Sequence, residues 1–123
     1  MYIGLDLGTS GLKAILIDDA QQIVAEASAP LTVQRPHPAW SEQTPADWLV
    51  AAGAVMADLG TQASLDAVRG IGLSGHMHGA TLVDAAGVVL RPCMLWNDTR
   101  SADEAAKMDA DPAFRGMTGN IVF

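Results

Sequence analysis

Residues 6–13, with the sequence DLGTSGLK, constrain the fold of this chain more than any other segment. A short apolar run precedes them, and a second apolar run follows them. Two apolar runs joined by a tight turn that contains glycine are typical of a β-hairpin. We therefore expect strands over residues 2–6 and 12–17, with the glycine-rich turn between them.

The residue types in this turn suit a site for metal-bound phosphate. Gly8 lets the backbone approach an anion closely, and Thr9 and Ser10 add hydroxyl donors to the backbone amides. Asp6 can hold a divalent cation beside the phosphate, because Mg²⁺ prefers one or two carboxylates together with phosphate oxygens. Lys13 either neutralises phosphate charge or is a solvated strand residue. The alternative to a phosphate site is an ordinary glycine-rich hairpin.

Two common phosphate-binding motifs do not fit. A Walker loop has a lysine directly after its second glycine, whereas here Leu12 precedes Lys13 and the loop leads into a strand-like run. Residues 70–75 match the dinucleotide fingerprint G-x-G-x-x-G by letters. They lie in and just after a predicted strand, 68–74, and a strand-like run, 80–83, follows them. A true fingerprint opens a helix, so we do not expect a Rossmann site.

The rest of the chain predicts alternating strands and helices. Residues 22–28 form a third strand that completes an antiparallel meander. Thr44 and Pro45 open a helix, for which Gly60 is the expected end. The apolar face of that helix is predicted to consist of Trp48, Leu49, Ala52, Val55, Met56 and Leu59, packed against the core.

Two further elements are expected after the strand over 68–74. Residues 80–90 predict a second hairpin, and residues 101–108 predict a second helix. Before the first helix, the proline-rich segment 30–45 contains Trp40, which either rims a sugar site or covers the edge of the sheet.

Composition limits the partners of the protein. The 123 residues are half hydrophobic with a net charge of −7, which predicts a globular domain. A negative chain is a poor partner for nucleic acid or an anionic membrane, but it can still bind ATP locally. Cys93 is the only cysteine, and we find neither a leader peptide nor a spanning apolar run. We therefore expect a soluble protein of the reducing cytoplasm.

A histidine pair is the second candidate for chemistry. His76 and His78 would share one face of a strand and could ligate zinc together, although a zinc site needs three or four ligands. The other interpretation is sugar recognition, in which an imidazole bonds a hydroxyl group and Met77 packs beside it.

Five sequence blocks together resemble one known family. Residues 6–13 resemble the first phosphate motif of the actin-like ATPase and sugar kinase superfamily. With them, the chain is similar to the amino-terminal part of FGGY-family carbohydrate kinases, most of all to the xylulose kinases. The other four blocks are residues 40–43 (WSEQ), 74–79 (SGHMHG), 96–100 (WNDTR) and 118–120 (TGN).

The resemblance implies a fold and a set of site residues. The fold would be a ribonuclease H-like α/β domain with a mixed sheet, an antiparallel meander and helices, here truncated. Asp6 would serve catalysis by holding Mg²⁺, and ATP would bind at Gly8, Thr9, Ser10 and Lys13. The sugar would bind at Met77, His78, Asp98 and Arg115.

Some details of this set stay open at the level of sequence. His76 stands where the family usually has glutamine. Asp98 and Arg100 either contact the substrate or pair locally to fix their loop.

The activity implied by the resemblance is transfer of phosphate from Mg-ATP to a ketose. D-xylulose, phosphorylated at C5, is the first choice, and gluconate, ribulose and glycerol are alternatives. Family members are several times longer, so residues 1–123 would be an incomplete first domain, with the catalytic base elsewhere. Two other interpretations are a non-catalytic module that binds sugar or forms a homodimer through the apolar residues 121–123, and an actin-like ATPase without a sugar role.

Overall fold

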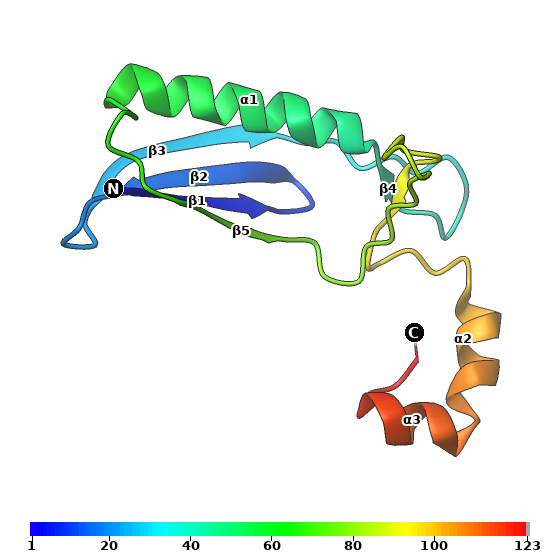
Figure 1. The fold of residues 1–123 in the computed structure, drawn as a ribbon. Helices are drawn as coiled ribbons and strands as arrows, with labels where there is room; N and C mark the ends of the chain where they lie inside the picture. Colours follow the sequence, from blue (N-terminus) through cyan, green and yellow to red (C-terminus); the bar gives the residue numbers. More distant parts are fainter. Residues whose placement is uncertain (123) are drawn as a thin grey trace.

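The computed structural model describes residues 1–122, and its centre is a mixed four-stranded sheet (Figure 1). The strands lie in the order β3-β2-β1-β5. Their bounds are Tyr2–Leu7 for β1, Gly11–Ile17 for β2, Ile23–Pro30 for β3 and Ile71–Gly75 for β5. β1, β2 and β3 pair antiparallel, and β5 pairs parallel to β1. The predicted hairpin, meander and mixed sheet are confirmed.

One long helix, α1 (Pro45–Gln62), covers one face of this sheet (Figure 1). Ala51, Val55 and Leu59 recur every four residues, so they share one side of the helix, and each is at least 95 % buried. Small alanines on both surfaces let the helix approach the strands closely. The sheet residues buried beneath α1 are Ile3, Leu12, Ala14, Leu16, Ala25 and Ala27.

The structure corrects two details of the predicted helix. α1 continues past Gly60 to Gln62, because Gly60 lacks the positive φ of a terminating glycine. Leu49 is 77 % exposed, and Ala51 is buried in its place. The predicted apolar face is therefore wrong at Leu49 alone among these residues: Val55 and Leu59 lie in the core as expected, and Ala52 and Met56 pack half-buried against it.

A small second sheet lies beyond the start of α1. It pairs β4 (Glu42–Gln43) with β6 (Cys93–Met94) in antiparallel orientation. The predicted hairpin over 80–90 is wrong as a pair of strands. One bridge joins Val83 to Val89, around a turn in which the Asp84 side chain accepts backbone N–H bonds. The turn at Asp84 forms, but the residues that flank it share a single bridge, which is too short to make strands.

The C-terminal part is a helical hairpin of α2 (Ala102–Asp109) and α3 (Pro112–Thr118), which projects away from the sheet (Figure 1). The α2 prediction is confirmed within one residue at each end. α3 was not predicted, although Asp111 caps it and Gly119, with a φ of 69°, ends it. No helix among residues 1–122 is long and apolar enough to cross a bilayer.

Candidate functional site

The turn between β1 and β2 is held in place by the backbone of the sheet. The Gly8 N–H donates to the Gly11 carbonyl over 2.9 Å, which closes the turn. The Leu31 N–H donates to the Ser10 carbonyl over 3.0 Å, which ties the turn to the end of β3. A Cβ atom at Gly11 would lie 2.7 Å from the Ala29 carbonyl oxygen, so this position requires glycine.

Asp6 and Lys13 lie together on the face of the sheet opposite α1. In the strand register, Asp6 pairs with Lys13 of β2 and with Ser74 of β5. Directly paired residues point to the same face, with Cβ atoms roughly 5 Å apart. All three residues line an open hollow of about 470 Å³. A carboxylate, an ammonium group and a hydroxyl therefore line the same hollow on the face of the sheet beside the glycine-rich turn.

The donor set at this hollow fits a hard cation that is shared with phosphate. Asp6 is exposed and offers one carboxylate, which is enough for Mg²⁺ when phosphate oxygens and water complete its shell. Among residues 1–122, no three His, Cys, Asp or Glu side chains cluster in a way that could hold a metal by themselves. The zinc interpretation of His76 and His78 therefore gains no support.

The loop after β5 differs from the strand expected at the histidine pair. β5 ends at Gly75, and His78 has a left-handed backbone with a φ of 62°. The two histidines therefore do not alternate along a strand. Met77 is 71 % exposed. His78 lines a small pocket of about 200 Å³ together with Trp96 and Asp98, so two of the predicted sugar residues meet there.

Gln43 connects the two loops from a buried position. Its side chain is 1 % exposed, and its Nε2 donates to the Thr9 carbonyl over 2.7 Å. Its Oε1 accepts from the Trp48 indole N–H over 3.0 Å and lies 2.9 Å from Nε2 of His76. Burial lowers the pKa of the His76 imidazole, and the charge of Asp6 opposes that shift.

A buried ionic cluster fixes the segment around β4. The carboxylate of Glu42, 7 % exposed, accepts from Arg91 and from Arg100, each over 2.7 Å. The Asp98 carboxylate, 4 % exposed, bonds Arg100 Nε over 2.7 Å and the Ser41 backbone N–H over 2.7 Å. Asp98 and Arg100 therefore do pair locally, which was one of the two alternatives.

Trp40 belongs to the same cluster. The Arg100 guanidinium lies 3.6 Å from the centre of the Trp40 ring, and His37 packs edge-on against that ring at 4.7 Å. This packing favours a covering role for Trp40, here over the ionic cluster, because one ring face is already occupied.

Asp98 gives a testable dependence of stability on pH. The pKa of the Asp98 carboxyl lies well below its usual range. The main cause is its hydrogen bonding with the Arg100 side chain, and the bond from the Ser41 N–H lowers the pKa further. A depressed native pKa adds stability above the unfolded value of about 3.9, and that stability is lost as the pH falls toward the native pKa. We expect the stability difference between wild type and Asp98→Asn to shrink as the pH is lowered from about 5 to about 3. Urea unfolding of both proteins across that range measures it, and a constant difference would contradict the assignment.

Arg115 lies on α3 and forms an ion pair with Asp109. Its Nε donates to that carboxylate over 3.0 Å. This hydrogen bond is the main reason that the pKa of the Asp109 carboxyl is lowered. The helical hairpin thus engages Arg115 locally, and its role in sugar binding stays a prediction.

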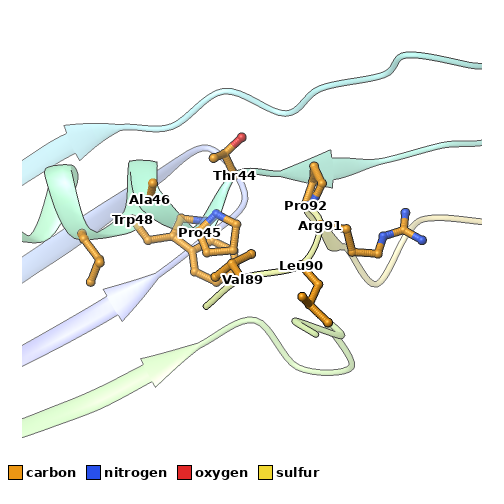
Figure 2. Close-up of a pocket in the computed structure, with 9 residues that line it drawn as sticks. Thr44, Pro45, Ala46, Trp48, Val89, Leu90, Arg91 and Pro92 are labelled. Carbon is orange, nitrogen blue, oxygen red and sulfur yellow. The ribbon is translucent and has the colours of Figure 1, made fainter. Parts of the chain in front are cut away.

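An apolar groove of about 520 Å³ runs between the first turn of α1 and residues 89–92 (Figure 2). Figure 2 shows Pro45 and Trp48 of α1 with Val89 drawn next to Pro45, and Leu90 and Pro92 farther to the right. Trp48 also lines a second hollow, of about 510 Å³, beside His76. Trp48 and Leu49 therefore border both hollows.

Sequence reasoning missed Gln43, Glu42 and Arg91 as organising residues. Glu42 and Gln43 were visible as part of the WSEQ block, but their partners are distant in sequence. A second signal was that these two polar residues directly precede the predicted N-cap, Thr44, in a segment rich in proline.

Comparison with known proteins decides the family. Residues 1–123 match the N-terminal domain of the FGGY family of carbohydrate kinases. The chain is a member of the FGGY family. Xylulose kinases from Klebsiella pneumoniae and Escherichia coli are each 51 % identical to this FGGY chain over 99 % of its length. The chain spans only 26 % and 25 % of those two relatives, about a quarter of their length.

Solved structures show the same fold. A "xyloylose kinase" from Brucella ovis superimposes with a TM-score of 0.96 at 61 % identity, covering 99 % of this FGGY chain and 26 % of that protein. A xylulose kinase from Rhodospirillum rubrum superimposes with a TM-score of 0.89 at 41 % identity. The match covers 98 % of this FGGY chain and 26 % of that protein. A glycerol kinase from Plasmodium falciparum, at 20 % identity, shares the fold alone with a TM-score of 0.84 over all of this chain and 26 % of its own. The predicted fold, that of the actin-like ATPases, is confirmed.

Proposed function

We propose that the protein containing this FGGY domain transfers phosphate from Mg-ATP to a ketose, most specifically to C5 of D-xylulose. One observation carries the proposal. β1 and β5 run parallel, with Leu7 opposite Gly75, so the glycine-rich turn and the loop with Met77 and His78 leave the sheet at the same end. In open α/β sheets, ligands bind outside the carboxyl ends of such strands.

The residues on the phosphate side divide the work by chemistry. Asp6 would hold Mg²⁺, which supplies positive charge to the phosphate oxygens when it is bound. The backbone amides of the turn, with the hydroxyls of Thr9 and Ser10, would contact phosphate. Lys13, which pairs with Asp6 in the register, would add positive charge on the same face. Phosphoryl transfer depends mainly on positioning and charge stabilisation, which are what such groups provide.

The residues on the sugar side would grip the substrate. The His78 imidazole would bond a hydroxyl group, and the exposed Met77 side chain would pack against the carbon skeleton. Asp98 shares the His78 pocket, but Arg100 and Ser41 already occupy its oxygens, so it would act mainly by fixing the pocket wall.

The catalytic base is not assigned to a residue of this chain. Because the chain spans about a quarter of its relatives, we propose that the base and the adenosine site belong to the remainder of a longer cytoplasmic protein. Homodimer formation through residues 121–123 stays a prediction, and Phe123 lies outside the described residues.

The test is a substrate comparison with the full-length protein. ATP consumption is measured with D-xylulose, L-ribulose, gluconate and glycerol, each at several concentrations and with Mg²⁺. We expect the highest kcat/KM for D-xylulose and a phosphate on C5 of the product, which ³¹P and ¹³C NMR detect. Activity on none of the ketoses would overturn the proposal, and preference for glycerol or gluconate would change the assigned sugar.

A further inference from the structure

Gln43 occupies an unusual place between the two loops. It lies on β4, outside the main sheet, yet its amide reaches the glycine-rich turn through Thr9 and the sugar loop through His76. At 1 % exposure it cannot exchange these partners for water. Every hydrogen bond it loses therefore leaves a buried polar group unsatisfied, which is more costly than losing a surface bond.

The partners determine which atoms donate. The Trp48 indole N–H and the Gln43 amide N–H₂ can only donate, so Oε1 of Gln43 accepts from Trp48 while Nε2 donates to the Thr9 carbonyl. Oε1 of Gln43 can only accept a hydrogen bond, so Nε2 of His76 has to donate to it. His76 must then carry its proton on Nε2, and the ring is fixed in that tautomer or in the protonated form.

We propose that Gln43 is a positioning residue that couples the phosphate loop, residues 8–11, to the sugar loop, residues 76–79. A shift of either loop strains the same buried amide, so the two loops hold one relative geometry. The proposal deepens the proposed function, on which it rests. It also explains how a histidine can stand where the family usually has glutamine, because both side chains offer an N–H to Oε1 of Gln43.

The test uses variants of the full-length protein that each cut one arm of the network. Gln43→Met keeps the volume and removes every bond. Gln43→Glu keeps an acceptor for Trp48 and His76 but cannot donate to Thr9. His76→Leu cuts the sugar-loop arm alone, and His76→Gln restores an N–H donor. Gln34→Met is the matched control, because the hydrogen bonds of the Gln34 side chain go to the Thr44 side chain, and the substitution keeps its backbone bridge to Glu42.

Two measurements are made on each variant: KM for ATP and for sugar, and hydrogen–deuterium exchange of peptides over residues 7–12 and 75–80. We expect Gln43→Glu to raise both KM values and the exchange of both loops by about fivefold, the scale of one lost hydrogen bond. Gln43→Met should raise them further, because it removes all three bonds of the amide. His76→Leu, which does not touch the turn, should still raise KM for ATP and the exchange of residues 7–12. His76→Gln should return both to near wild type.

The outcomes distinguish a merely structural role of Gln43 from coupling of the two loops. If the Gln43 variants lower the unfolding temperature and kcat while both KM values and loop exchange stay unchanged, Gln43 is merely structural and the proposal is wrong. If Gln43→Met fails to fold, the comparison of His76→Leu with His76→Gln tests the coupling instead. Increased hydrogen exchange in His76→Leu that is confined to residues 75–80 would overturn the proposal. A wild-type protein without kinase activity would sink the proposed function, whereas the exchange measurements would still test the coupling.

Discussion

Replacing Asp6 with alanine should lower kcat of the full-length protein by about a hundredfold or more. The Asp6 carboxylate is the acidic group beside the glycine-rich turn on the open face of the sheet, opposite Lys13. Removing one preorganised group that stabilises charge during the reaction costs turnover on this scale. Steady-state kinetics at saturating D-xylulose and Mg-ATP measure it.

The fold should survive this change, because Asp6 is exposed and core packing lies on the other face, under α1. Glu26→Ala is the matched control, since Glu26 is an exposed carboxylate on β3 of the same sheet. We expect near-normal turnover for that variant and unchanged unfolding temperatures for both. Asp6→Ala with more than half of wild-type turnover would remove Asp6 from its assigned role.

The second large effect is on stability. Replacing Arg100 with methionine should lower the free energy of unfolding by about 3 kcal/mol, because it leaves Glu42 and Asp98 as buried carboxylates with one partner fewer. It also removes the guanidinium that stacks on Trp40. Urea unfolding at neutral pH measures the change.

Arg69→Met is the control for that loss. Arg69 pairs with Asp19, but both side chains are more than half exposed, at 58 % and 68 %. Exposed pairs contribute below about 1 kcal/mol, so this variant should unfold close to wild type. Equal losses for the two variants would show that the buried cluster adds nothing beyond an ordinary surface pair.

Local patterns predicted the parts of the fold that depend on neighbours in sequence. The hairpin over β1 and β2, the third strand and the start of α1 at Pro45 each follow from a turn or cap next to an apolar run. The same approach failed where burial depends on distant partners. The exposure of Leu49 and the burial of Ala51 are set by how α1 sits on β2 and β3, which periodicity alone does not specify.

The site shows the same division. Asp6, Lys13 and the turn residues could be proposed as candidates because they are contiguous, and the shared face of Asp6 and Lys13 follows from the register of the hairpin. Gln43 was missed because its partners are 34 residues away at Thr9 and 33 residues away at His76. The role of a buried amide such as that of Gln43 can be recognised only once the parallel pairing of β5 with β1 has placed the loop after β5 beside the glycine-rich turn.

Equilibrium binding to the full-length protein distinguishes the proposed phosphate side of the site from the proposed sugar side. D-xylulose and Mg-ADP are titrated separately into wild type, Asp6→Asn and His78→Ala, with isothermal titration calorimetry as the readout. We expect Asp6→Asn to weaken Mg-ADP binding and to leave D-xylulose binding within about twofold, whereas His78→Ala should do the reverse. Loss of the same ligand in both variants, or no binding of D-xylulose to wild type, would contradict it.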